Sequence, residues 1–450
     1  MTSTSSTSTS PTSAGPASTA LLTDHYELTM LQAALRSGAA SRRCIFEVFT
    51  RRLPEGRRYG VVAGTGRLLQ AVLDFRFDDA EIEWLRDHDV VDSLTLEYLS
   101  NYRFAGNISG YAEGECYFAG SPLLVVEGSF AESVLLETVL LSILNHDSAI
   151  ASAASRMTNA AAGRPCIEMG SRRTHEWAAV AAARAAYIAG FATTSNLEAG
   201  RTHGIPTAGT SAHAFTLLHD DERTAFEAQV ACMGSGTTLL VDTYDVPAAV
   251  ALAVEIGGVG LGAVRLDSGD LLVQAREVRA QLDELGARDT RIIVTSDLDE
   301  HAIAALAAAP VDAYGVGTCL VTGSGAPTAG LVYKLVARDD PAGRLVNVTK
   351  ESKDKATRGG RKWAMRRLNT RGQAESEIIG TGEMPAPSGS DRPLLVDLIR
   401  DGEIVVDRGR DALEAARTRY EQSLAELPAR ARQLSRGEPV IETIFQDELE

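Results

Sequence analysis

The amino-acid sequence predicts an α/β protein made of two parts, and three observations support this. Between residues 165 and 336, short apolar runs alternate with helical stretches, which is typical of parallel β-strands covered by helices. Several of these runs end in Gly, Ser, Arg, Asp or His, and the active sites of such folds lie where the strands end. The residues before 165 mix helices and strands without this alternation, which indicates an α+β domain.

Composition limits the classes of protein to which the chain can belong. Its 450 residues are 44% hydrophobic, enough for two domains or for one large barrel with additions. The formal net charge of −16 argues against nucleic acid or an anionic membrane as a partner, but not against small phosphorylated substrates. No apolar run was expected to reach the length of a transmembrane helix. The five scattered cysteines form no C-x-x-C pair and are typical of a reduced, cytoplasmic enzyme without disulfides or a zinc site: Cys44, Cys116, Cys166, Cys232 and Cys319.

The first part of the chain begins with a polar tail. Residues 1–18 are rich in Ser, Thr, Pro and Ala and lack the apolar core of a signal peptide, so they predict a disordered tail. Residues 19–145 are expected to form the α+β domain. Its predicted elements are a helix over Leu21–Gly38 capped by Thr23 or Asp24, a strand over Cys44–Arg52, helices over Gly66–Leu73 and Asp79–His88, a hairpin of Tyr111–Phe118 with Pro122–Val126, and an apolar helix over Ser129–Leu144.

The second part, residues 146–349, carries the β-α alternation, and its strand count suits a complete or an incomplete barrel. The predicted strands are Cys166–Met169, Ile205–Thr207, Thr238–Val241, Gly262–Arg265, Ile292–Thr295, Ala313–Val316 and Leu331–Val336. The predicted helices between them are Trp177–Ala189, one containing Arg223–Met233, Pro247–Ile256, Leu271–Leu285 and Leu298–Ala308. After residue 350 the pattern predicts a strand over Trp363–Leu368, a hairpin over Leu394–Val406 and an amphipathic helix over Asp411–Leu427.

The strand ends combine three kinds of chemistry. Ser171–Arg173 and Arg265 supply cations, and arginine can bind phosphate or carboxylate through two hydrogen bonds. Gly315-x-Gly317-Thr318 offers backbone N–H groups at the start of a helix, where phosphate binds readily. A sugar phosphate that bears a diphosphate would use both features.

Acidic side chains provide the third kind of chemistry. Asp242, Asp267 and Asp270 could hold Mg²⁺ or accept hydrogen bonds from ribose hydroxyls. The alternative for each is a helix N-cap, and for Asp270 and Asp297 the two interpretations are equally supported.

The stretch Gly204–His213 is the centre of the predicted site. Small residues allow a ligand to approach the backbone, and Thr210 and Ser211 add hydroxyl donors before the histidine. A single histidine after a strand is more often a hydrogen-bonded structural residue, so this stretch gains weight only from the other strand ends.

These residues form motifs by which the chain resembles the bacterial nicotinate phosphoribosyltransferases from Leu22 to about Val406. Two positions depart from the family pattern: Ser211 stands where the family often has Met, and Thr193 replaces a Gly. The motifs are Leu22-Thr23-Asp24-x-Tyr26-x-Leu28-Thr29-Met30, Glu168-x-Gly170-Ser171-Arg172-Arg173, Thr194-Ser195-Asn196, Gly209-Thr210-Ser211-Ala212-His213, Arg265-Leu266-Asp267-Ser268-Gly269-Asp270 and Gly315-Val316-Gly317-Thr318.

The resemblance implies a fold and a reaction. The fold is the irregular, incomplete α/β barrel of type II phosphoribosyltransferases, with a first domain completed by the C-terminal segment 350–450. The reaction converts nicotinate, phosphoribosyl pyrophosphate, ATP and water to nicotinate mononucleotide, pyrophosphate, ADP and phosphate. It would proceed through phosphorylated His213, since neutral imidazole is a nucleophile near pH 7. His219 is the nearest alternative histidine, in a setting that looks helical.

The resemblance also implies roles for individual residues, as well as Mg²⁺ and a homodimer in which Tyr26 reaches the other subunit's site. Without the motifs, Tyr26 would equally be a half-buried core tyrosine, and Arg172 and Arg265 would be surface ion-pair partners. The implied catalytic residues are His213, Arg265 and Asp267; the nicotinate-binding residues are Tyr26, Arg172, Thr210 and Arg265; the residues for phosphoribosyl pyrophosphate are Arg172, Ser211, Asp242, Asp267, Ser268, Gly269, Gly317 and Thr318; Asp242 is the implied Mg²⁺ ligand.

Three alternative functions remain open from the sequence. The related nicotinamide-using family has an Asp in the segment that matches Thr194-Ser195-Asn196, where this chain has no acid. Quinolinate phosphoribosyltransferases are shorter and lack the Gly-Thr-x-Ala-His motif. A non-catalytic phosphate-binding sensor would be favoured by the loss of His213, Arg265 or Asp267, and all three are present.

Overall fold

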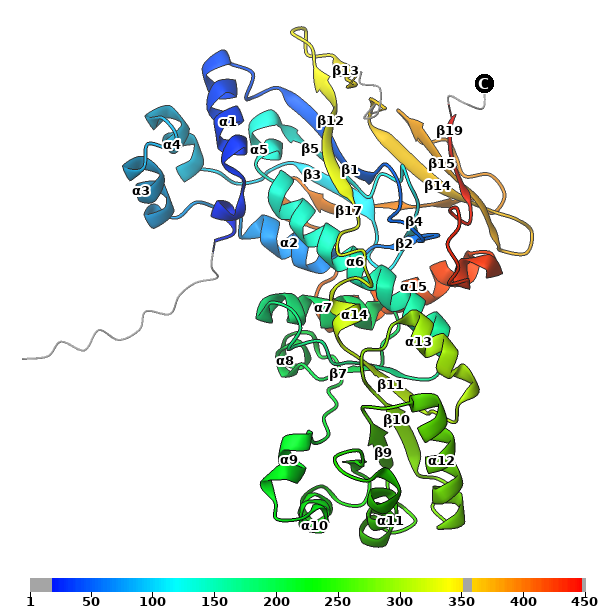
Figure 1. Cartoon of the computed structure of the whole chain (residues 1–450). Helices are drawn as coiled ribbons and strands as arrows, with labels where there is room; N and C mark the ends of the chain where they lie inside the picture. The colour runs from blue at the N-terminus through cyan, green and yellow to red at the C-terminus, as the bar shows by residue number, and fades with distance from the viewer. Residues whose placement is uncertain (1–17, 351–357, 447–450) are drawn as a thin grey trace, which may run out of the picture.

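A computed structural model describes residues 18–350 and 358–446, which form an upper and a lower part connected by a long helix (Figure 1). The upper part is built on mostly antiparallel sheets, and the lower part on a parallel sheet covered by helices. Of the predicted tail, residues 1–18, only Ser18 lies among the described residues.

The upper part contains a seven-stranded antiparallel sheet with the order β13-β12-β1-β5-β3-β17-β18. Strands from the beginning, the middle and the end of the chain therefore share hydrogen bonds. The strands are β1 (Arg43–Thr50), β3 (Asn107–Tyr111), β5 (Leu124–Ser129), β12 (Leu331–Asp339), β13 (Leu345–Asn347), β17 (Leu395–Arg400) and β18 (Glu403–Ile404).

A second sheet joins the C-terminal segment to the N-terminal one. Arg366, which is fully buried, donates to Glu115 Oε1 at 3.0 Å and to Glu377 Oε2 at 2.9 Å, so an ion-pair network fastens this sheet to the loop before β4. The sheet has the order β16-β14-β15-β19: β14 (Lys362–Leu368), β15 (Ala374–Thr381), β16 (Arg392–Pro393) and β19 (Glu442–Phe445); a separate pair is β2 (Gly60–Val61) with β4 (Cys116–Tyr117).

Helices cover the upper sheets on one side (Figure 1). The helix predicted to start at Leu21 is divided: a 3₁₀ turn, η1 (Ala20–Leu22), precedes α1, whose N-cap residue Asp24 makes no side-chain capping bond. The helices are α1 (His25–Ser37), α2 (Thr65–Leu73), α3 (Asp79–Asp87), α4 (Ser93–Ser100), α5 (Phe130–Val134) and α6 (Glu137–Ala161), and α4 was not predicted.

Helix α6 runs from the upper part into the lower one and forms part of both hydrophobic cores. By length and composition alone, the helical stretch Phe130–Ala161 could cross a membrane, which corrects the expectation that no apolar run was long enough. However, 67% of its apolar window is buried inside the protein. This burial is typical of the core helix of a globular protein.

The lower part is a six-stranded parallel sheet with the order β7-β6-β11-β10-β9-β8, which confirms an incomplete barrel: among the described residues no strand links β7 to β8. The strands are β6 (Cys166–Glu168), β7 (Thr193–Thr194), β8 (Thr238–Leu240), β9 (Ala263–Leu266), β10 (Arg291–Val294) and β11 (Ala313–Val316). The helices are α7 (Glu176–Ile188), α8 (Leu197–His203), α9 (His213–Leu218), α10 (Glu222–Met233), α11 (Val246–Gly257), α12 (Leu271–Glu284), α13 (Glu300–Ala305), η2 (Leu306–Ala308) and α14 (Thr318–Val321).

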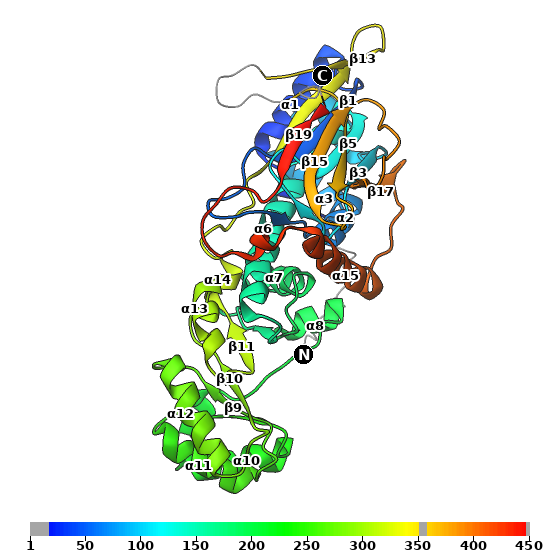
Figure 2. The same cartoon turned by 90° about the vertical axis from the view of Figure 1, so that its right-hand side faces the viewer.

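Helix α15 (Arg410–Glu426) and the turn η3 (Ala429–Arg432) return the chain to the junction of the two parts. Figure 2 shows α15 between them, beside α7. A buried ion-pair cluster also crosses this junction: Arg57 Nη1 and Arg156 Nε, at 3.3 and 2.8 Å, both contact Glu300 Oε1. The five cysteines all lie within the described residues and are free, as predicted.

Three predicted strand assignments are wrong in whole or in part. Leu331–Val336 belongs to β12, which pairs antiparallel with β1 and not with the parallel sheet. Ile205–Thr207 forms no strand, only a bridge between Thr194 and Thr207. The predicted hairpin of Tyr111–Phe118 with Pro122–Val126 is only partly present: β3, which ends at Tyr111, pairs antiparallel with β5, but Cys116–Tyr117 form β4, which pairs with β2. In each case an apolar run was identified correctly, but its partner depends on contacts distant in sequence.

Candidate active site

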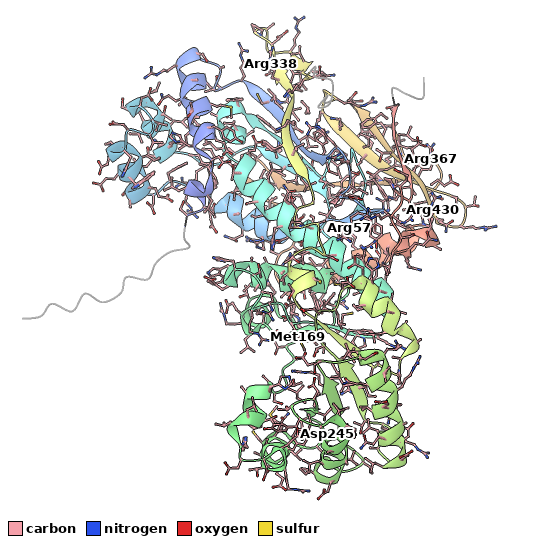
Figure 3. All side chains as sticks on the ribbon, in the orientation of Figure 1. Arg57, Met169, Asp245, Arg338, Arg367 and Arg430 are labelled. Carbon is pink, nitrogen blue, oxygen red and sulfur yellow. The ribbon has the colours of Figure 1, made fainter. Side chains whose placement is uncertain are left out.

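The carboxyl ends of the parallel strands surround a cavity of about 440 Å³. Met169, labelled in Figure 3, follows β6 and lines this cavity. The predicted site residues that line it are Arg172, Thr210, Ser211, Arg265, Asp267, Gly317 and Thr318. His213, Asp242, Ser268 and Gly269 lie next to it without lining it, and Tyr26 is distant.

His213 is the first residue of α9 and lies between two carboxylates. Its Nδ1 forms a hydrogen bond with Thr243 Oγ1 at 3.1 Å. Its Nε2 lies 3.9 Å from Asp242 Oδ1 and 3.8 Å from Asp267 Oδ2. If Nδ1 carries the proton, Nε2 has a free lone pair directed toward the strand ends.

Asp242 organises the loop that follows β9. Its Oδ2 accepts from the backbone N–H of Asp267 at 2.8 Å and from Ser268 Oγ at 2.7 Å. Its Oδ1 is buried and has no hydrogen-bond partner among the described residues. Thr295 Oγ1 donates to Asp267 and thereby orients that carboxylate. An unpartnered buried carboxylate oxygen fits a cation or a donor supplied by a ligand.

The described residues contain no group of three or more His, Cys, Asp or Glu side chains that could hold a metal ion. Mg²⁺ is commonly bound by one or two carboxylates together with substrate phosphates. The pair Asp242 and Asp267 fits that smaller donor set.

Arg265 points a cation into the cavity from β9. Its Nη1 donates to Thr210 Oγ1, while its Nε is buried and has no acceptor among the described residues. Burial lowers the pKa of Arg265, Asp267 and Asp242 raise it, and the nearby charge of Arg172 lowers it further. An anion in the cavity would satisfy Arg265 Nε and offset the cost of placing two arginines close together.

Crowding by neighbouring atoms explains the glycines before α14. A Cβ on Gly315 would lie 2.5 Å from Thr295 Cγ2 and 2.8 Å from Met169 Sδ. Gly317 precedes Thr318, the first residue of α14, so the backbone N–H groups there face the cavity edge without a side-chain cap. The G-x-G spacing thus arises from crowding between β6, β10 and β11.

The buried carboxylate of Glu168 holds the part of the cavity wall that follows β6 and β7. Glu168 accepts from Thr194 Oγ1 and from the N–H of Gly170, and burial raises the pKa of Glu168. The Glu168 carbonyl accepts from Ser195 N–H at 2.8 Å, which places Ser195 on the cavity. Asn196 caps α8 and donates to Ser171 Oγ at 3.0 Å, joining two of the predicted motifs.

The structure also decides the two open questions on helix caps. Asp270 accepts from Val273 N–H and caps α12. Asp297 lines the cavity, and the cap of α13 is Asp299.

Sequence reasoning did not single out Thr243, Thr295 and Ser296. Ser296 has a positive φ of 115°, a strained backbone for serine that places it at the cavity. A Thr or Ser within three residues of each strand end was the available signal, but such residues are common in loops.

Tyr26 lies far from this cavity, in the first turn of α1 in the upper part (Figure 1). Tyr26 is 47% exposed. Burial raises the pKa of Tyr26, and the neighbouring carboxylate of Glu137 raises it further. Within one chain, Tyr26 therefore does not meet the strand ends.

Known sequences similar to this chain are nicotinate phosphoribosyltransferases. Residues 21–145 match the family model described as the nicotinate phosphoribosyltransferase (NAPRTase) N-terminal domain. The chain is 58% identical to nicotinate phosphoribosyltransferase pncB1 of Mycobacterium tuberculosis over 432 residues, covering 94% of each chain. It is 39% identical to the Bacillus subtilis enzyme, over 78% of this chain and 74% of the relative.

Solved structures lead to the same group. Human nicotinic acid phosphoribosyltransferase matches with a TM-score of 0.79 and 27% identity, over 95% of this chain and 98% of that one. Nicotinate-nucleotide pyrophosphorylase from Pyrococcus furiosus matches with a TM-score of 0.74 and 25% identity, over 90% and 96% of the two chains.

Proposed function

The chain belongs to the nicotinate phosphoribosyltransferase family, and we propose that it joins nicotinate to phosphoribosyl pyrophosphate to form nicotinate mononucleotide and pyrophosphate. We assign it to the type II phosphoribosyltransferase fold and to the ATP-coupled enzymes of the family. The similar proteins are named for nicotinate, which favours nicotinate over nicotinamide, and an intact set of site residues argues against a sensor.

One observation carries the proposal: two buried polar atoms of opposite character face the same strand ends without a partner. Arg265 Nε is a donor without an acceptor, and Asp242 Oδ1 is an acceptor without a donor, among the described residues. A substrate with anionic groups and a bound cation would satisfy both.

Nicotinate would lie on the arginine side of the cavity. Arg172 and Arg265 provide positive charge for its carboxylate, and Thr210, held by Arg265, lies beside it. Tyr26 would cover the pyridine ring from a second subunit.

Phosphoribosyl pyrophosphate would lie across the ends of β9 and β11. Asp267 would accept from ribose hydroxyls, and the N–H groups at Gly317 and Thr318 would hold the 5-phosphate. The remaining contacts would come from Arg172, Ser211, Asp242, Ser268 and Gly269. The glycosidic bond breaks with oxocarbenium character, so positioned charge around the diphosphate is expected to supply most of the catalysis.

Mg²⁺ would be held by Asp242, with Asp267 beside it, and by the diphosphate. When bound, it would neutralise part of the charge on the leaving group. Asp242 Oδ1 has the free coordination position that such a role requires.

ATP would act through His213. The Nε2 lone pair attacks the γ-phosphorus, the bond to ADP breaks, and a later attack by water releases phosphate from the imidazole. Thr243 supports this role, since a proton held on Nδ1 leaves Nε2 as the nucleophile. The two carboxylates beside Nε2 would repel the incoming phosphoryl group, which a bound cation would offset.

A homodimer would complete the site. Large apolar side chains are exposed after several strand ends, at Trp177, Leu197, Leu218 and Tyr244. These side chains and exposed Tyr26 would become buried if α1 of a second copy covered the cavity. We place the enzyme in the cytoplasm, without nucleic-acid or membrane partners.

Mass spectrometry of the products tests the proposal. The purified chain is incubated with phosphoribosyl pyrophosphate and either nicotinate or nicotinamide, with and without ATP and Mg²⁺. We expect nicotinate mononucleotide, a rate increase with ATP, and ADP formation that depends on nicotinate. Nicotinamide mononucleotide as the main product, or no product in any combination, would exclude the proposed reaction.

A further inference from the structure

A second cavity, of about 880 Å³, lies at the junction of the upper and lower parts. It is bordered by α2, α6, α7, α8, α15 and the loop that precedes α15, and it shares no lining residue with the strand-end cavity. The function proposed above uses none of its residues.

One end of this cavity gathers three arginines around two carboxylates. Arg184 forms two hydrogen bonds with Glu113, at 2.6 and 2.7 Å, and Arg67 contacts Asp147 Oδ1 at 2.7 Å. Arg419 donates to the Glu113 carbonyl at 2.7 Å, and no carboxylate of the described residues lies within 4.0 Å of its guanidinium. The cluster therefore has one positive charge more than its carboxylates balance.

His203, at the end of α8, lies beside this cluster, and the charges of the cluster affect its pKa. Burial, together with the nearby charges of Arg184 and Arg67, lowers the pKa of His203 to about 4, and Glu113 and Asp147 offset only part of the effect of the two arginines. The imidazole is thus neutral at pH 7 and lies in a net positive field. It can donate one hydrogen bond to an anion bound beside the arginines.

The rest of the cavity is largely apolar. The acidic residue Asp74, which lines this cavity, is the C-cap residue of α2. It lies about 13 Å from the N-terminal end of that helix, at a rise of 1.5 Å per residue. Arg408, on the loop before α15, donates to Gln70 Oε1 at 3.1 Å, and its neighbour Asp407 lies beside it. The apolar wall consists of Leu22, Leu69, Ile143, Leu398 and Val405.

We propose that this cavity binds a nucleoside monophosphate, with its phosphate between Arg67, Arg419 and His203 and its base against the apolar wall. A compact cationic end beside an apolar wall matches a ligand with one anionic group and a flat heterocycle. The volume of about 880 Å³ is within the range of sites for ligands of that size. The site is separate from the reaction centre.

The test measures binding of AMP to a full-length variant in which the strand-end cavity is disabled. In the Arg265→Gln protein, we expect calorimetry to detect binding of AMP. The affinities for inorganic phosphate and for adenosine should each be at least about tenfold weaker than the affinity for AMP. The NMR signal of His203, assigned with His203→Gln, should show its pKa rising when AMP binds, because a nearby anion favours the imidazolium form.

Substitutions in the cluster should weaken this binding. Adding Arg419→Gln or Arg67→Gln to the Arg265→Gln protein should weaken its affinity for AMP at least about tenfold. Adding Arg419→Lys should weaken this affinity less, because the positive charge is kept. Arg400→Gln is the matched control, since Arg400 is exposed on β17, pairs with Asp397 and lies outside the cavity. Thermal melting of each variant checks that it is folded.

Three results would overturn the proposal. Loss of AMP binding in Arg265→Gln alone would place the ligand at the strand ends. Unchanged affinity in a folded Arg419→Gln protein would exclude the cluster. Equal affinity for inorganic phosphate or for adenosine would exclude a nucleotide as the ligand. None of these results depends on turnover, so they remain distinct from failure of the proposed reaction.

Discussion

At the scale of single residues, Asp242 connects the parts of the candidate active site. One carboxylate oxygen holds the Asp267–Ser268 turn, and the other faces His213. The turn, the histidine and any bound cation are therefore coupled through one side chain, which is nearly buried. Loss of this carboxylate would disturb all three, so substitutions at His213 and Ser195 separate the roles more cleanly.

His213→Ala should abolish the stimulation by ATP while leaving slow, ATP-independent transfer, because the strand-end contacts to the other substrates remain. The measurement compares product formation with and without ATP and follows ³²P from γ-labelled ATP into acid-labile protein phosphate. His219→Ala, at the end of the same short helix, is the control and should retain stimulation. Acid-labile ³²P in the His213→Ala protein would disprove the assignment.

Ser195→Asp should lower the activity with nicotinate, because the new carboxylate repels the carboxylate of the substrate. Ser195 lines the cavity with Arg172 and Arg265, and two like charges 4 to 8 Å apart cost about 2–4 kcal/mol at an effective dielectric constant near 20. The expected loss of kcat/KM for nicotinate is about 30- to 1000-fold, with a much smaller loss for nicotinamide.

The control for that prediction is Ser195→Asn, which has a similar size without the charge. Both proteins are assayed with both pyridines at saturating phosphoribosyl pyrophosphate and ATP. Equal losses for the two substrates in Ser195→Asp would mean that Ser195 does not lie near the pyridine carboxylate.

At the scale of secondary-structure elements, a buried acid joins α1 to α6. Glu27 Oε1 accepts from the N–H of Thr138 at 3.0 Å and from its hydroxyl, and Thr23 donates to Oε2. Glu27 and Tyr26 are neighbours in α1, so this contact also positions the tyrosine. The α1–α6 contact is therefore sensitive to the charge state of one carboxyl group.

Glu27→Gln should flatten the pH dependence of stability in the acid range. Burial raises the folded-state pKa of Glu27 to about 7 from 4.5, so the folded state binds its proton more tightly than the unfolded state does. That contribution is fully present below the unfolded value and decreases as the pH rises toward 7. Urea unfolding at pH 5 and pH 7 should show a smaller difference in the variant than in the parent protein.

Glu83→Gln, which removes an exposed carboxylate from α3, is the control for the Glu27 prediction. It should leave the pH dependence of the parent unchanged. A Glu27→Gln protein with the full pH dependence would show that this carboxyl group is not the one responsible.

At the scale of the whole molecule, the separation of Tyr26 from the strand ends requires a second copy if Tyr26 contacts substrate. Tyr26→Ala and His213→Ala proteins should each be impaired in the ATP-driven reaction. Mixed dimers formed after subunit exchange should regain part of it, because one of their two sites combines an intact cavity with an intact Tyr26. Activity is measured on heterodimers separated by two affinity tags, and no recovery in such heterodimers would exclude sites shared between subunits.

Local sequence determined the alternation of strands and helices in the lower part. Buried parallel strands are short apolar runs, and the side chains after them are free to carry chemistry, so β9, β10 and β11 and the residues at their ends could be recognised from composition and spacing. The same reasoning found Arg265 and Asp267, because Arg265 lies near the end of β9 and Asp267 directly follows it. Tyr26 was found only through the family resemblance.

Only the tertiary structure decided which strands pair and which polar groups lack partners. Leu331–Asp339 is an apolar strand in any context, yet it belongs to the upper sheet because β1 offers it a complementary edge. Arg366 becomes a buried junction residue only when Glu115, distant in sequence, and Glu377, on the neighbouring strand β15, surround it. The pairing of strands, the burial of side chains and the missing hydrogen-bond partner of Asp242 Oδ1 all depend on neighbours that folding brings together. The spacing of residues along the chain does not encode those neighbours.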